Sequence, residues 1–99
     1  MSNNKIEVSP QIALAATGAS SAVAIPYQNG GCVITAHVYG TFGGTSVKLQ
    51  VSPDGTNWGD APGTAVTAAG AISAVVACRF ARIFATGGAG ISLNAKIAY

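Results

Sequence analysis

The stretch Val47-Lys48-Leu49-Gln50-Val51-Ser52 alternates apolar and polar side chains without a break. Because successive side chains of a β-strand point to opposite faces, this pattern places its three apolar side chains on one face. A one-residue slip in register would bury Lys48, so the alternation also determines which face is inward. The same pattern returns in Ile91-Ser92-Leu93-Asn94-Ala95-Lys96-Ile97. The sequence therefore predicts antiparallel strands with an inward face made of Val47, Leu49, Val51, Ile91, Leu93 and Ile97.

Further strand signals occur along the whole chain. The segment 33–39 is rich in β-branched and aromatic residues, and other strand-like segments lie at 11–16, 20–26, 64–68, 71–77 and 79–86. Two glycine-rich connections, 40–44 and 87–90, suit hairpin turns between neighbouring strands. About eight short strands with turns between them predict an all-β fold, a small antiparallel β-sandwich with a jelly-roll-like arrangement.

The chain has 99 residues, which suits a single small domain. Residues 1–10 differ from the rest because they are polar and end at a proline, with Ile6 and Val8 as apolar side chains. We therefore expect an extended N-terminal arm at 1–10 and a single β-sandwich domain at 11–99. A frayed tail is the alternative for the first ten residues.

Charged residues make up 8% of the chain, against about 25% in an ordinary soluble domain. The net charge is +2 and no run of Lys or Arg is present, so the electrostatic signal of nucleic-acid binding is missing. No targeting segment is visible, and no apolar segment has the length of a membrane span, about 20 residues. We expect neither a nucleic-acid nor a membrane partner, and synthesis in a cytoplasm.

Few side chains suit chemistry. Cys32 and Cys78 are too few for a disulfide framework, and we expect buried thiols that form no zinc site with the lone His37. His37 alternates with the core positions around it and should point away from them. Asp54 and Asp60 flank a turn, where acid–base catalysis or calcium binding is possible but a structural role in the turn is favoured. The sequence thus predicts no catalytic residue, no metal, no cofactor and no enzyme activity.

Two sets of large side chains suggest surfaces for binding. Trp58 is either a plug over the sandwich edge or a stacking platform for a sugar or a base. Phe80, Arg82 and Phe84 alternate on one strand whose other face is also apolar, and a strand apolar on both faces is covered on both sides. We expect these three side chains near a subunit or shell contact, together with Ile6 and Val8 of the arm. The competing interpretation is that the N-terminal segment folds over this second face.

The alternating strand ends in Ser52-Pro53-Asp54-Gly55-Thr56-Asn57-Trp58. This stretch resembles the strand and Ser-x-Asp-Gly-Thr-x-Trp turn of small β-sandwich modules from tailed-phage virions. The segment 79–88, followed by an alternating last strand, resembles the C-terminal hairpin of the same modules. The resemblance covers about half of the chain and includes Asp54, Gly55 and Trp58 as the turn motif.

Members of this family serve as capsid decoration (cement) proteins, head fibres and parts of tails or baseplates, and they often form trimers. The resemblance implies a homotrimeric decoration protein on the virion surface that binds the major capsid protein. A surface poor in charge fits such a role, because low charge is less harmful where much of the surface is buried in an assembly. The alternatives are another virion part, or a carbohydrate-binding module that uses Trp58 with Tyr27 or Tyr39.

Overall fold

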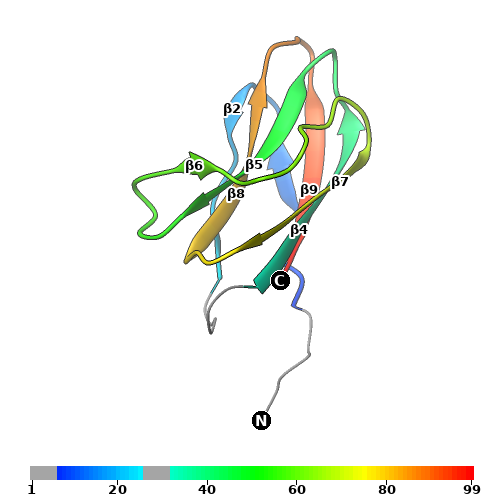
Figure 1. The fold of residues 1–99 in the computed structure, drawn as a ribbon. Coiled ribbons are helices and arrows are strands. Elements are labelled where there is room, and N and C mark those ends of the chain that lie inside the picture. Colours follow the sequence, from blue (N-terminus) through cyan, green and yellow to red (C-terminus); the bar gives the residue numbers. More distant parts are fainter. Residues whose placement is uncertain (1–6, 26–31) are drawn as a thin grey trace.

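Two antiparallel sheets form the protein (Figure 1). The computed structural model describes residues 7–25 and 32–99, with only the backbone described at Cys32. The four-stranded sheet has the spatial order β1 (Ile12–Leu14), β9 (Ser92–Ala98), β4 (Cys32–Thr41) and β7 (Gly70–Val76). The five-stranded sheet has the order β2 (Gly18–Ala19), β8 (Phe80–Thr86), β5 (Ser46–Ser52) and β6 (Gly59–Asp60), and β3 (Val23–Ala24) also pairs with β8.

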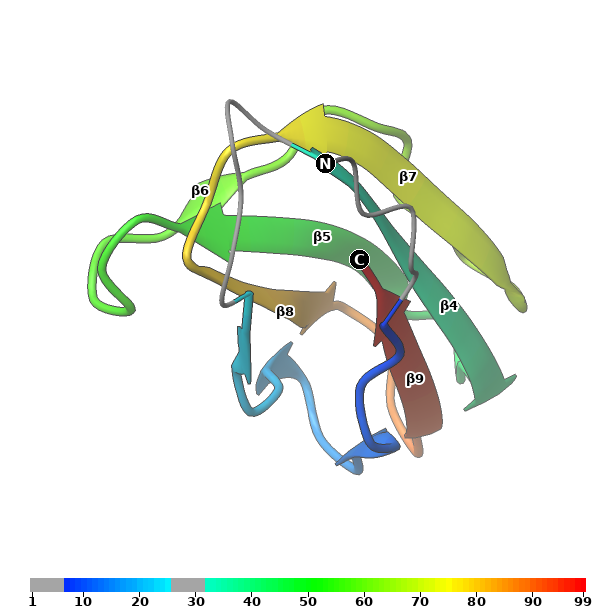
Figure 2. The ribbon, with the colours of Figure 1, turned by 90° about the horizontal axis from the view of Figure 1, so that it is seen from below.

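The two sheets pack face to face as the layers of a sandwich (Figure 2). Successive strands alternate between the layers, and among the described strands only the β2–β3 and β5–β6 connections stay within one sheet. This order is that of a jelly roll in which β2 and β3 share the place of one strand. The predicted all-β sandwich is therefore confirmed. The segment 64–68, predicted as a strand, contributes only an isolated bridge between Val66 and Val47.

The two glycine-rich connections are not hairpins, and this prediction was wrong. The connection 42–45 leads from β4 in one sheet to β5 in the other, and 87–91 leads from β8 back to β9. The two crossings pack backbone to backbone: the Ala89 amide donates to the Gly43 carbonyl at 3.0 Å. Gly43 and Gly88 both have positive φ, at 58° and 75°. Glycine composition marked the turns, but it carries no information on which strands pair.

The core between the sheets matches the predicted inward face. Val47, Leu49 and three side chains of the C-terminal segment are buried, whereas Val51 is half-buried. On β8 the inward residues are Ala81, Ile83 and Ala85. The three buried side chains of the C-terminal segment, all of them predicted to face inward, are Ile91, Leu93 and Ile97.

Residues 7–9 lie along the end of β9. The backbones of Glu7 and Tyr99 exchange hydrogen bonds at 2.7 and 2.9 Å, and the Ser9 amide donates to the Ile97 carbonyl at 2.8 Å. The buried Ser9 hydroxyl in turn accepts a hydrogen bond from the Ile97 amide at 2.9 Å. This part of the expected arm thus extends the sheet, while Ile6 lies outside the described residues.

A membrane-spanning helix is not found: within 7–25 and 32–99 no helix has the length and apolar character to cross a bilayer.

Candidate interaction surfaces

The turn after β5 is organised by Asp54. Its carboxylate accepts hydrogen bonds from the backbone amides of Asn57 and Thr56, both at 2.8 Å, and from the Asn57 side chain at 2.7 Å. The Ser52 hydroxyl, held at the strand end, accepts a bond from the Gly55 amide at 2.8 Å. The Asn57 amide contributes most, and together with the Thr56 amide, the Asn57 side chain and the Ser52 hydroxyl, which donates to Asp54 Oδ1 at 3.0 Å, it favours the charged carboxylate and holds the pKa of Asp54 well below its usual range.

Gly55 and Trp58 complete this turn. Gly55 has φ +82°, a conformation that side chains rarely adopt, and a Cβ there would lie 3.2 Å from the Phe80 ring. The Trp58 indole nitrogen donates to the Gly55 carbonyl at 3.2 Å. These contacts turn the loop back over the outer face of the five-stranded sheet, where Phe80 also lies.

Trp58 is half-buried on this outer face and does not belong to the core between the sheets. The Arg82 guanidinium lies 4.0 Å from the centre of its ring, and Arg82 Nε donates to Gln50 Oε1 at 2.9 Å. Arg82 is also 5.8 Å from the centre of the Phe84 ring. We call Trp58, Phe80, Arg82 and Phe84 the aromatic cluster.

The polar rim of the aromatic cluster is formed by Lys48, Gln50 and Asp60. Lys48 Nζ lies 3.2 Å from Asp60 Oδ2, and Gln50 Nε2 donates to Asp60 Oδ1 at 3.0 Å. The Gln50 bond, followed by the Lys48 bond, lowers the pKa of Asp60. Lys48 Nζ also lies 5.9 Å from the centre of the Phe84 ring. The polar side chains beside the aromatic cluster are thus bonded to one another within the five-stranded sheet.

The described part of the N-terminal segment, residues 7–25, does not fold over the aromatic cluster. β2 and β3 pair with the edge of β8 and continue the sheet sideways. Phe80, Arg82 and Phe84 are each half-buried, so part of each side chain is open to a partner. Their expected contact with a subunit or shell stays a prediction.

The outer face of the four-stranded sheet has a different character. It carries all four of the large hydrophobic side chains that are exposed among the described residues, namely Val8, Val33, Tyr39 and Val75. Val33 and Val75 are direct cross-strand partners, and Val8 lies opposite Ala98. Lys96, paired with His37, is the one charged residue in the four strands. This face is poor in charge and partly apolar.

The remaining candidate residues lie apart. His37 is exposed on the four-stranded sheet, as predicted, while Asp54 and Asp60 belong to the other sheet and its turn. Within the described part of the chain, no three His, Cys, Asp or Glu side chains gather as metal ligands. Cys78 is buried, as expected, and the Cys32 side chain lies outside the described residues.

Trp58 and Tyr39, two of the aromatic residues proposed for a sugar site, are not brought together. Tyr39 lies on the outer face of the four-stranded sheet, opposite to the face that holds Trp58. Tyr27 lies outside the described residues. The Arg82 guanidinium lies over one face of the Trp58 ring, so that face is already stacked within the chain.

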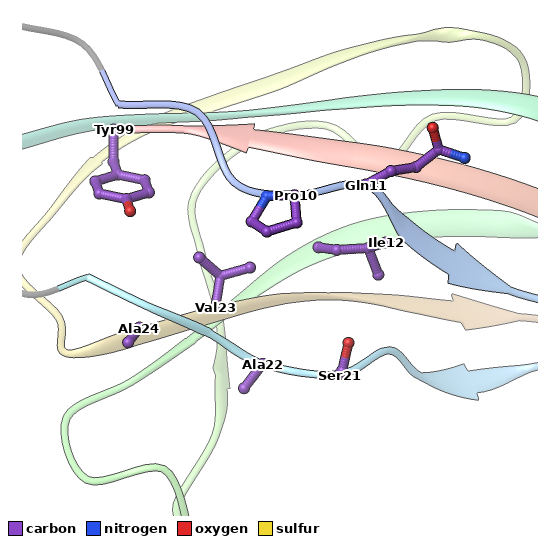
Figure 3. Close-up of a pocket in the computed structure, with 8 residues that line it drawn as sticks. All are labelled: Pro10, Gln11, Ile12, Ser21, Ala22, Val23, Ala24 and Tyr99. Atoms are coloured by element: carbon purple, nitrogen blue, oxygen red, sulfur yellow. The ribbon is translucent and has the colours of Figure 1, made fainter.

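A pocket of about 310 Å³ opens between β1 and β3, which lie at neighbouring edges of the two sheets (Figure 3). The side chains of Pro10, Ile12 and Val23 point toward one another across it, and Tyr99 lies at one end (Figure 3). The rest of its lining is Gln11, Ser21, Ala22 and Ala24. Sequence reasoning missed this pocket, because its walls come from edges of different sheets that no local pattern relates.

Comparison with known proteins gives no relative: no family model, no curated protein and no solved structure matches this chain.

Proposed function

We propose that this protein is a capsid decoration (cement) protein of a tailed phage. It binds the major capsid protein on the outer shell and stabilises contacts between capsomers, and it is made in the host cytoplasm before it joins the virion. The proposal rests on the resemblance of the 47–58 stretch and the C-terminal segment to virion modules. The jelly-roll order of the strands supports it, because this architecture is common among viral capsid proteins.

The observation that carries the proposal is the outer face of the four-stranded sheet. A solvated sheet face normally alternates to polar and charged side chains, but the strands of this sheet carry Lys96 as their one charged residue. The same face exposes 57% of Val33 and 75% of Val75. Exposed apolar side chains on a face with so little charge are typical of a protein–protein interface. We infer that this face lies against the shell.

The aromatic cluster offers the competing contact surface. Its side chains are half-buried, and Arg82 already stacks on Trp58 and bonds to Gln50. A partner would therefore gain less newly buried apolar area there than on the four-stranded sheet. The two faces lie on opposite sides of the sandwich, so one substitution on each face shows which of them contacts the shell.

The test compares Tyr39→Asp with Phe84→Asp in co-sedimentation with purified capsids. We expect the recombinant chain to bind capsids, Tyr39→Asp to lower capsid occupancy about tenfold or more, and Phe84→Asp to retain it. Both variants are first checked for a folded β spectrum by circular dichroism. Loss of occupancy in Phe84→Asp alone would move the shell contact to the aromatic cluster, as the sequence predicts.

Imaging of virions with the labelled chain tests the location directly. Label on the head surface supports a decoration protein, whereas label on tail, baseplate or head fibre supports the other virion parts. A chain that binds no capsid and is absent from virions would overturn the proposal. The homotrimer implied by the resemblance stays a prediction for a mass measurement by sedimentation.

A further inference from the structure

Four sheet edges bound the sandwich, and β7 differs from the others. Edge strands are templates for pairing with another chain, and proteins protect them by shortness, charge or proline. β1 has three residues, β2, β3 and β6 have two each, and β6 contains Asp60 and is followed by Pro62. β7 runs for seven residues, Gly70–Val76, without a charge or a proline. It is the long unprotected edge in the described part of the chain.

The ladder of hydrogen bonds shows which backbone groups of β7 face outward. The amide and carbonyl of Ile97 bond to Ser9, on the side away from β4. Its partner Ala36 therefore bonds toward β7, where it faces Ile72. The backbone groups of Ile72 thus point toward β4. Since successive residues of a strand point their amides and carbonyls to opposite sides, those of Ala71, Ser73 and Val75 point outward, away from β4.

No backbone bond from the described loops reaches these outward groups. Gly63 of the β6–β7 connection approaches them, since a Cβ at Gly63 would lie 3.4 Å from the Ser73 carbonyl oxygen. The Gly63 backbone thus runs beside the edge, where its Cβ would also lie 3.1 Å from Ile72 Cγ2, and the absence of a side chain leaves more room there than another residue would. Val75, with 75% of its area exposed, and its cross-strand partner Val33 add apolar surface beside the edge.

We propose that a second copy of this chain pairs with β7, antiparallel and about a two-fold axis at Ser73. In this register Ser73 faces the partner's Ser73, and Ala71 faces the partner's Val75. All outward amides and carbonyls then meet outward groups of the partner, and each of these facing pairs exchanges two hydrogen bonds. The two four-stranded sheets become one continuous sheet.

The side chains of β7 fit those of a second copy on both faces of the sheet. On the outer face the exposed Val75 meets the small Ala71 of the partner, and on the inner face Ile72 meets the partner's Ala74. A large side chain therefore lies opposite a small one at both of these positions, Ser73 faces its own copy on the axis, and no charge faces another across it. A two-fold contact needs this self-complementarity, which an unrelated strand would not require.

This inference does not depend on the proposed function. It differs from the trimer that the resemblance implies, because a two-fold contact produces a dimer or an even-numbered assembly. Sedimentation of the recombinant chain alone therefore decides the form of self-association, without any capsid.

The experiment uses two variants of β7 and a matched control for each. Ser73→Pro removes an outward amide that the β4 ladder does not use, and Thr35→Val controls for the Thr35–Ser73 side-chain bond of 2.8 Å. Val75→Lys places a charge beside the edge, and Ser92→Lys places the same charge on the same sheet, away from β7. We expect a dimer for wild type, with a dissociation constant raised about tenfold or more by each β7 variant and unchanged by each control.

Hydrogen exchange distinguishes an edge contact from a face contact. The amides of Ala71, Ser73 and Val75 should gain protection as protein concentration rises, and Val75→Lys should abolish that gain. Circular dichroism and the thermal midpoint check that the variants fold. A monomer at every concentration, a trimer, or a dimer that both β7 variants leave intact would overturn the proposal. Protection of these amides only after capsids are added would overturn it in favour of strand addition by a capsid segment.

Discussion

The guanidinium of Arg82 lies 4.0 Å from the centre of the Trp58 ring, although the two residues belong to a central strand and to a turn of the five-stranded sheet. The contact joins the Ser52–Trp58 turn to the outer face of β8. A planar guanidinium both stacks on the indole and donates a bond to Gln50 at 2.9 Å. An ammonium group on a flexible chain cannot reproduce this pair of contacts.

Arg82→Lys should therefore destabilise the protein although the charge is kept. We expect the free energy of unfolding to fall by about 0.5–1.5 kcal/mol, from the lost stacking and the lost side-chain bond. Urea unfolding followed by Trp58 fluorescence measures this change. The matched control is Arg79→Lys just before β8, where the side chain is exposed, with an expected change below about 0.5 kcal/mol. Equal effects at the two arginines would show that the Trp58 contact contributes nothing.

The inward face of β5 supplies the second prediction. Leu49 is 1% exposed in the centre of the core, so Leu49→Ala should lower the free energy of unfolding by about 2–5 kcal/mol through lost burial and a residual cavity. Ser92→Ala, on an exposed position of β9, serves as the control and should change it by less than about 0.5 kcal/mol. A loss below about 0.5 kcal/mol at Leu49 would mean that the assigned core face is wrong.

Local alternation was enough to predict these faces, because one buried side of a strand imposes a period of two residues. It could not predict the partners of β4 and β8, since pairing joins segments far apart in the chain. The position of Trp58 was also beyond the sequence, because the turn at Asp54 decides to which side the indole folds. In 71–77 valines occur on both faces, so composition did not distinguish the exposed Val75 from a core residue.

Asp54 should make stability depend on pH in the acid range. Its pKa is lowered in the folded protein, chiefly by the Asn57 amide, from an ordinary value of 3.8. The carboxylate therefore contributes stability that is full well above pH 3.8 and is lost as pH falls toward the folded pKa, because the unfolded chain takes up the proton first.

Comparison of wild type with Asp54→Asn measures this dependence. Urea midpoints should differ most near neutral pH and converge as the pH falls below the ordinary pKa of the carboxyl. Thr56→Ala leaves the backbone amide that bonds to Asp54 in place, so it should keep the pH dependence of wild type. A constant gap between wild type and Asp54→Asn at all pH values would contradict the assigned role of the carboxylate.

The two crossings between the sheets provide a test with two neighbouring glycines. Gly87 and Gly88 both have φ +75°, so alanine at either position is strained by a similar amount, about 1–2 kcal/mol. A Cβ at Gly87 meets nothing within 4 Å, whereas a Cβ at Gly88 would lie 2.5 Å from the Thr45 amide and 2.7 Å from the Gly43 carbonyl. These atoms are backbone and cannot move aside as a flexible side chain would.

Gly88→Ala should therefore lower the free energy of unfolding by about 1–3 kcal/mol more than Gly87→Ala, the added cost of forcing the two crossings apart. Chemical denaturation of both variants, under the same conditions, gives the difference without knowledge of the strain itself. If 87–90 were a simple hairpin turn open to solvent, both variants would lose the same stability. Equal losses would thus argue against the packed crossings, and with them against the path of the chain between β8 and β9.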